Sequence, residues 1–427
     1  MLGLLGVMSM LFALTLLPRV VTAASRIGSS IPPSLPGAIL LEGKALPFLY
    51  GRQLVEIQVF AFHSHTLTPI LFQIDERDRR GRWVITAGPR PSRDNKPDIF
   101  DANDALIFLS RDLGVQTAID TLPQASGAWH EIRLGPPTSP FGFVYIGLGV
   151  ALARSDAPPP VRYMPDEDRI YTERYTLEFG APLPTHLAFV SALGEFGQNT
   201  IAGVRIAGEI RFLGGLLRIR RTDQDLQSRL YGYRQGPVRI IRRARYWFPL
   251  PFGLRATGRI DLIFYPDCVE GTALIKLKIP PRLVLADGEL STYLDFLNFS
   301  GARVLLAGNS TREPANGLMT QARKASTQQP TRWAALLLPT GQTLLLLTRL
   351  EGKLQQLDQR VYFEDKTQPV GGQPAFGFHF SKVSRLDAGT YRLSIFGLLL
   401  DTTDSEDIQS AATFFLSPPV ITVSRLR

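Results

Sequence analysis

Acidic side chains gather near the start of the chain, between residues 72 and 114. They stand on segments rich in turn residues, where closely spaced oxygen ligands can bind calcium. The spacing does not fit an EF-hand loop, because no glycine stands mid-loop and no glutamate closes it. The simpler interpretation is that these side chains form turns with their own backbone. The candidate calcium ligands are Asp98, Asp101, Asn103 and Asp104, preceded by an acidic group at Asp75, Glu76 and Asp78.

A second concentration of chemistry is basic: thirteen arginines lie between Arg205 and Arg259. In the strand-like segments 204–213, 238–248 and 259–265, apolar residues alternate with charged ones, so several arginines share one face. Guanidinium groups bind carboxylates and sulfates through paired hydrogen bonds, and aromatic rings stack on sugars. The candidate ligand-binding residues are Arg205, Arg211, Tyr231, Tyr233, Arg234, Arg239, Arg243, Arg245, Trp247 and Arg259, with Lys276 and Lys278 if the strands are neighbours.

This pattern predicts a cationic face for an acidic polysaccharide or another polyanion. Two alternatives stay open. The face could be an ordinary solvated side of an antiparallel sheet, or it could be a surface covered by the more acidic first part of the chain.

Catalytic constellations are scarce. The chain has five histidines, and the HExxH, GxSxG, SxxK and P-loop patterns are absent. If the protein is an enzyme, a glycan lyase or epimerase is the best candidate, because a base and a cation could come from Tyr231, Tyr233, Arg234 and His186. Clustering of Tyr231, Arg234 and His186 in one concave cleft would support that hypothesis.

The N-terminal segment predicts export. Residues 2–17 are almost wholly apolar, and small residues follow at 21–24, so we expect a cleaved signal peptide over residues 1–24 and a periplasmic or extracellular protein. No later apolar run is long enough to span a membrane. The net charge is +9, which suits an anionic partner. Cys268 is the only cysteine, so an intramolecular disulfide is impossible.

Short β-rich runs between turns predict an all-β protein of two domains with few short helices. We expect a lead-in loop at 25–37, an Ig-like antiparallel sandwich at 38–153, a proline-rich linker at 154–168, and a larger, supersandwich-like antiparallel sandwich at 169–427. Segment 288–299 fits a short helix or a strand, 311–331 a long loop, and 412–416 a strand.

Two short motifs carry a resemblance. The segments Phe72–Glu76 with Asp78 and Asp101–Phe108 resemble a pattern in bacterial secreted proteins of unknown function, and Gln235–Arg239 resembles a strand start common in them. Those proteins are similar in architecture to galactose-mutarotase-like supersandwiches and the glycan-processing enzymes built on them. Here Ala105 replaces the acidic residue that follows Asp104 in the pattern. The resemblance transfers no catalytic residue.

The leading functional hypothesis is an exported envelope or extracellular binding protein that presents a cationic sheet face to acidic polysaccharide. The alternatives are a glycan-active enzyme of lyase or epimerase type and a structural or assembly component of an envelope complex with a protein partner. We expect no nucleic acid partner, and calcium is the one cofactor that the residues suggest.

Overall fold

The computed structural model describes residues 36–427 with gaps. Outside the description lie 1–35, 124–126, 137–139, 151, 181–182, 191–194, 196, 213–216, 250–254, 278–279, 282–284, 298–300, 308, 311–329, 365–372, 418–419 and 427. The expected signal peptide and most of the expected loop at 311–331 fall in these gaps. No helix in the described ranges is long and apolar enough to cross a membrane.

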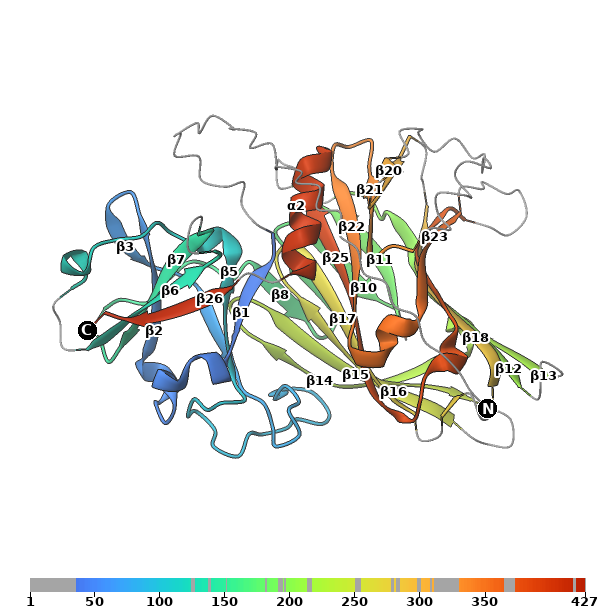
Figure 1. Cartoon of the computed structure of the whole chain (residues 1–427), viewed down its shortest axis with the longest axis horizontal. Coiled ribbons are helices and arrows are strands. Elements are labelled where there is room, and N and C mark those ends of the chain that lie inside the picture. Colours follow the sequence, from blue (N-terminus) through green and yellow to red (C-terminus); the bar gives the residue numbers. More distant parts are fainter. Residues whose placement is uncertain are drawn as a thin grey trace, which may run out of the picture. The chain divides into compact units, whose positions relative to one another are not determined.

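The described residues form five antiparallel sheets, as expected for an all-β protein of packed sandwiches (Figure 1). Two sheets make the first sandwich. One has the order β1-β5-β4, with bounds Ala38–Glu42, Ala105–Leu109 and Phe72–Asp75. The other has the order β26-β6-β7-β2-β3, with bounds Ile421–Arg425, Ala128–Leu134, Gly142–Leu148, Ile57–His63 and Thr66–Pro69.

The larger sandwich is built on a nine-stranded sheet. Its order is β14-β15-β16-β17-β25-β22-β21-β19-β20. The bounds are Gln227–Gln235, Ile240–Pro249, Arg255–Phe264, Cys268–Leu277, Gly389–Leu400, Thr343–Leu350, Trp333–Leu337, Arg303–Leu306 and Asn309–Ser310.

Two smaller sheets complete the larger sandwich. One has the order β13-β12-β18-β24-β23, with bounds Leu217–Thr222, Ile201–Phe212, Leu285–Phe296, Ala375–Ser381 and Asp358–Glu364. The other has the order β11-β10-β9-β8, with bounds Pro184–Phe189, Tyr175–Phe179, Arg169–Thr172 and Val161–Met164. β8 therefore lies within the segment expected to be a linker, and segment 288–299 is mostly strand.

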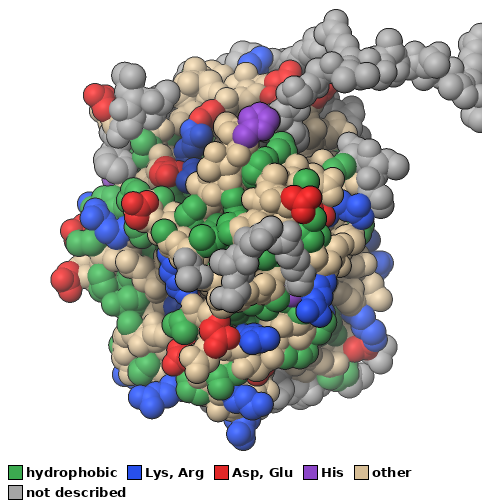
Figure 2. Space-filling model, turned by 90° about the vertical axis from the view of Figure 1, so that its left-hand side faces the viewer, with side chains coloured by type: hydrophobic (Ala, Val, Ile, Leu, Met, Phe, Trp, Pro, Cys, Tyr) green, Lys and Arg blue, Asp and Glu red, His purple; other side chains and the backbone are tan. Residues whose placement is uncertain are grey.

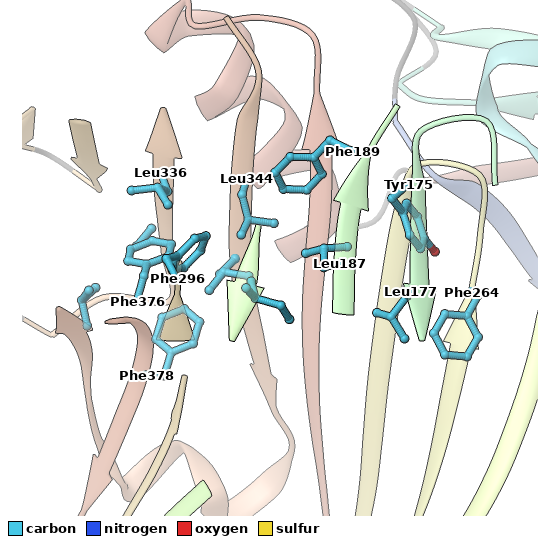
Figure 3. Close-up of a cluster of buried hydrophobic side chains, with 14 of the residues drawn as sticks. Tyr175, Leu177, Leu187, Phe189, Phe264, Phe296, Leu336, Leu344, Phe376 and Phe378 are labelled. Atoms are coloured by element: carbon cyan, nitrogen blue, oxygen red, sulfur yellow. The ribbon is translucent and has the colours of Figure 1, made fainter. Parts of the chain in front are cut away.

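The main core lies between the nine-stranded sheet and the two smaller sheets (Figure 3). Phe264 comes from the nine-stranded sheet, Tyr175 and Leu177 from β10, and Phe376 and Phe378 from β24. Because apolar side chains point inward at alternate positions, each of these strands can bury one face against this core.

The sheet β1-β5-β4 has a core on each side. In β5, Ala105, Ile107 and Leu109 pack against the outer face of the nine-stranded sheet, whereas Leu106 and Phe108 face the core of the first sandwich. A strand that is buried on both faces must be apolar throughout, which explains the continuous apolar run. The first sandwich therefore covers part of the larger sheet.

The C-terminal segment corrects one prediction. Residues 412–416 belong to helix α2, Ser405–Leu416, and are not a strand. The side chain of Asp404 caps the helix by accepting hydrogen bonds from the amides of Glu406 and Asp407. Ile408, Ala411 and Ala412 recur at helical spacing and are buried against the nine-stranded sheet. The chain then returns to the first sandwich, where β26 pairs with β6.

Short 3-10 helices occupy several connections. Their bounds are Gly43–Ala45, Pro47–Leu49, Leu54–Glu56, Ser110–Asp112, Ile119–Thr121, Asp223–Asp225, Gly352–Gln356 and Val383–Arg385.

A buried polar network joins the two sandwiches. Arg239 and Asp75 are both fully buried, and Arg239 Nε lies 2.7 Å from Asp75 Oδ2. Arg234 Nε lies 2.6 Å from Asp75 Oδ1, and Arg239 Nη1 donates to the Tyr265 hydroxyl at 2.8 Å. Burial by itself would raise the pKa of Asp75, but Arg239 and Arg234 outweigh it and lower the pKa.

Gln73 links the first and the last of the three segments that carry the resemblance. Its Oε1 accepts hydrogen bonds from the amides of Val238 (3.1 Å) and Arg239 (3.0 Å), and its Nε2 donates to Asp75 (2.8 Å). A Cβ at position 236 would lie 2.1 Å from the Gln73 amide, so only glycine fits at Gly236 without displacing it. The two motifs are therefore one structural contact between sandwiches.

Aromatic contacts complete the network. The guanidinium carbon of Arg239 lies 4.5 Å from the centre of the Trp83 ring, and that of Arg77 lies 3.8 Å from it. Arg239 Nη2 is buried without a hydrogen-bond partner, so the ring offers the compensating interaction.

We expect Asp75→Asn to lower the free energy of unfolding by about 3–5 kcal/mol, because it leaves the Arg239 charge buried without its counterion. Glu173→Gln is the control: it breaks the exposed pair with Arg111 and should cost less than about 1 kcal/mol. Urea unfolding measures both. Equal losses in the two variants would contradict the structural role of Asp75.

Candidate functional site

The predicted arginine face is divided in the structure. Arg205 and Arg211 lie on β12, in the sheet β13-β12-β18-β24-β23. The other candidates lie on the nine-stranded sheet, except Arg239, which lies in the turn between β14 and β15. The two sheets pack face to face across the main core, so their outer faces point away from each other. Arg205 is paired with Asp223 and Asp295, and Arg211 with Glu209. The expectation of a single arginine face is therefore corrected.

The first sandwich covers Arg243 in the first half of β15 and Arg239 in the turn before it. Besides Arg239, Arg243 is buried and forms two 2.7 Å hydrogen bonds with Asp261, its register partner on β16. Arg243 also donates to the Trp83 carbonyl of the first sandwich at 2.9 Å. Arg239 and Arg243 thus neutralise internal carboxylates and are not available to a ligand, and Asp75 neutralises Arg234 in part. For this part of the sheet, the structure agrees with the alternative that the first part of the chain covers the arginine face.

The outer part of the same face carries an arginine row, defined here as Arg229, Arg245, Arg259 and Arg392. Arg229 lies opposite Arg245, Arg245 opposite Arg259, and Leu274 separates Arg259 from Arg392. Residues directly opposite on neighbouring strands share one face of the sheet. The row therefore crosses the neighbouring strands β14, β15, β16, β17 and β25 in a line of about 19 Å.

No direct ion pair neutralises the arginine row within the residues that the structure describes. Within the described part of the chain, no carboxylate forms an ion pair with Arg229, Arg245, Arg259 or Arg392. Burial lowers the pKa of Arg259, and the neighbouring charges of Arg243 and Arg82 act in the same direction, whereas Asp261 and Asp78 oppose them. Like charges placed directly opposite destabilise a sheet. An anion bound along the row would relieve this repulsion.

A cavity of about 210 Å³ opens at one end of the row. Aromatic and cationic side chains line it together with one threonine: Arg90, Arg229, Tyr231, Arg245, Trp247 and Thr257. Trp247 lies on the same face as Arg245, and its indole Nε1 donates to Gln227 at 2.7 Å. The ring orientation is thereby fixed.

The first sandwich contributes Arg90 to this cavity. The amide of Arg90 donates to the Tyr231 carbonyl at 2.7 Å, and its guanidinium carbon lies 5.2 Å from the centre of the Tyr231 ring. Ala87 and Tyr233 exchange backbone hydrogen bonds of 3.0 and 2.9 Å, so this loop pairs with β14. The pairing needs Gly88, whose φ is +98° and whose added Cβ would lie 2.5 Å from Gly232 Cα.

Of the residues predicted from sequence, Tyr231, Arg245 and Trp247 line the cavity, and Arg259 continues the row. Tyr233 packs edge-to-face on Tyr163 at 4.8 Å and contacts the main core instead. The side chain of Lys276 and the whole of Lys278 lie outside the described residues. Sequence reasoning missed Arg90, Arg229 and Arg392. Alternation along β14 could have shown Arg229, whereas only tertiary structure brings Arg90 to the site.

The side of the molecule formed by the first sandwich has a different charge pattern. Figure 2 shows acidic and basic side chains interspersed there with hydrophobic ones. That side offers no uniform field to a polyanion, in contrast to the arginine row.

The acidic loop forms turns. Asp101 accepts a hydrogen bond from the Asn103 amide at 2.9 Å, and Asp104 accepts from the amides of Asp101 (2.7 Å) and Arg77 (3.3 Å). Asp98 has a left-handed φ of +65° and donates its amide to Glu76 at 2.8 Å. No group of three or more His, Cys, Asp or Glu side chains in the described ranges is arranged to hold a metal ion. These contacts favour turn formation over the calcium hypothesis.

Neither the cavity beside the arginine row nor the groove at Arg234 brings together the residues proposed for a glycan-active enzyme. Tyr231 lines the cavity beside the arginine row, Arg234 lines a separate groove, and His186 lies on β11 of another sheet. Neither cavity therefore brings Tyr231, Arg234 and His186 together.

We expect Asp104 to make stability depend on pH. Burial raises its pKa to about 7, with nearby Asp101 and Glu76 adding to the effect. A raised carboxyl pKa means that the folded state gains stability as pH falls from 8 to 5. Wild type should gain on the order of 2 kcal/mol in unfolding free energy relative to Asp104→Asn over this range. Urea unfolding of both proteins at each pH measures the difference, and parallel pH profiles would refute it.

Known proteins resemble this chain at low sequence identity. No family model matches the sequence, and no curated protein matches it. Among solved structures, an alpha-mannosidase from Enterococcus faecalis V583 is similar with 10% identity and a TM-score of 0.48 over 91% of this chain and 44% of that chain. The alpha-N-acetylgalactosaminidase NagBb from Bifidobacterium bifidum is similar with 13% identity and a TM-score of 0.35 over 60% of this chain and 37% of that chain. The Slr1438 protein from Synechocystis sp. PCC 6803 is similar with 10% identity and a TM-score of 0.35 over 59% of this chain and 100% of that chain. The chain thus spans less than half the length of the two enzymes' chains.

Proposed function

We propose that this protein is an exported binding protein that holds an acidic polysaccharide along the arginine row. The observation that carries the proposal is the direct opposition of Arg229, Arg245 and Arg259 on neighbouring strands without internal carboxylate partners. Elsewhere on the same face, Arg243 is neutralised by Asp261, so the sheet does pair arginines where no ligand is needed.

The chemistry of the cavity favours a sugar polymer. Arginine forks can hold carboxylate or sulfate groups through two parallel hydrogen bonds. Trp247 and Tyr231 add aromatic surface beside them, on which the apolar face of a sugar ring can stack. A row of about 19 Å is longer than one sugar, so a polymer can use contacts that a monosaccharide cannot. Export, inferred from the apolar N-terminal segment, would place the protein where such polymers occur.

Binding should be electrostatic with an aromatic component. Exposed charges are screened by salt, so affinity should fall as ionic strength rises. It should fall only partly when the aromatic surface alone is removed.

We expect Arg245→Glu to weaken binding of polygalacturonate at least tenfold, because it removes one charge-assisted contact and adds repulsion. Trp247→Ala should weaken it several-fold through lost stacking. Isothermal titration calorimetry at low salt measures both, with neutral dextran as the negative ligand and DNA as a test of polyanion class.

The matched control is Arg303→Glu, which makes the same charge change at an exposed position on β19 of the same sheet. It should leave affinity within about twofold of wild type, since distant exposed charges are screened. Equal losses for Arg245→Glu and Arg303→Glu, or no polygalacturonate binding by wild type, would overturn the proposal. Tighter binding of DNA than of polygalacturonate would reject the sugar assignment.

A further inference from the structure

A second cavity, of about 410 Å³, lies beside the free edge of β4. It is a groove between this edge, the 3-10 helix Leu54–Glu56 and the turn from β14 to β15, and we call it the β4 groove. Its walls are largely apolar, with Val55, Phe72 and Pro237 among them. Two arginines, Arg154 and Arg234, also line it, and no acidic side chain does.

The hydrogen bonds around β5 show which backbone groups face the groove. The carbonyls of Asp104 and Gly37 accept from Gly43 (2.7 Å) and Ser110 (3.2 Å), so the even-numbered residues of this strand bond to β1. Ala105 and Ile107 therefore bond to their partners Asp75 and Gln73 on β4. It follows that Phe72 and Ile74 point their backbone groups away from β5. The Ile74 carbonyl confirms this direction, because it accepts from Arg234 at 2.7 Å.

This outward edge is paired on both sides of the groove but not within it. Upstream, the amide of Ile70 donates to Val59 at 3.0 Å. Downstream, Glu76 accepts from Val84 at 2.9 Å. Between them, β4 is the edge of its sheet in the described part of the chain. Phe72 offers one N–H and one C=O there, and Ile74 offers one N–H.

Native proteins usually cover or charge such an edge, since it templates pairing with another chain. Here the arginines charge it with one sign. Asp75 already neutralises Arg234 in part, whereas exposed Arg154 donates to the Val55 carbonyl at 2.6 Å and has no carboxylate partner among the described residues.

We propose that the β4 groove binds an extended, acidic peptide segment of a partner protein. The peptide would add a short antiparallel strand to β4 through the backbone of Phe72 and Ile74, which is a known mode of peptide recognition. Apolar side chains of the peptide would lie against Val55 and Pro237, and a carboxylate would meet Arg154. This inference is independent of polysaccharide binding, which uses a different cavity.

The test begins with selection of phage-displayed random nonapeptides on the full protein, followed by synthesis of the enriched sequences. Enriched peptides should alternate apolar residues with Asp or Glu. Binding of the synthetic peptide should slow amide hydrogen exchange at Phe72 and Ile74, because their N–H groups become hydrogen-bonded.

Variants separate the groove from general charge attraction. Arg154→Glu should weaken the selected peptide at least tenfold, and Arg154→Lys less. Val55→Trp fills the groove from an exposed position and should abolish binding. Arg245→Glu, in the arginine row, should leave peptide affinity unchanged while it weakens polygalacturonate.

Three results would overturn the inference. The first is selection of no acidic extended sequence beyond those selected by Val55→Trp. The second is peptide binding that Arg154→Glu does not weaken. The third is concentration-dependent protection of Phe72 and Ile74 in the protein alone, which would identify the occupant as a second copy of this chain.

Discussion

The fully buried ion pair between Asp75 and Arg239 is the constraint on which the rest of the structure depends. Moving two charges out of water costs several kcal/mol per ion, so the pair persists only with further hydrogen bonds and good geometry. Gln73, Arg234 and Tyr265 supply those contacts. The pair therefore fixes β4 against the turn between β14 and β15. It also determines how much of the large sheet the first sandwich covers.

That coverage sorts chemically identical arginines into two roles. Under the first sandwich, Arg239 and Arg243 balance internal carboxylates. Beyond its edge, Arg229, Arg245 and Arg259 face one another without such partners. The covering sandwich then sends Arg90 to the boundary, where the loop pairs with β14. The cavity at this boundary is therefore lined by residues of both sandwiches.

Sequence patterns predicted the antiparallel strands well and their partners poorly. Alternation identified β12, β15 and β16, because a half-buried strand has a period of two. The same alternation could not distinguish Arg239 from Arg245, because the sequence pattern put both on one face. In the structure Arg239 lies in the turn before β15, buried under the first sandwich, whereas Arg245 is exposed on the strand itself. The strand expectation at 412–416 was wrong because a short apolar run has no clear period, and Asp404 was not recognised as a helix cap. The return of β26 to the first sandwich is a long-range pairing with no local signal.

The central claim is that the outer arginines remain unpaired so that they can meet an anionic polymer. A crystal structure of the protein with an oligogalacturonate of six sugars tests it most directly. The account predicts carboxylates of the ligand against Arg245 and Arg229, a sugar ring on Trp247, and an undisturbed pair between Asp75 and Arg239. A ligand bound on another face, or one that reaches Arg239 by displacing the first sandwich, would contradict it.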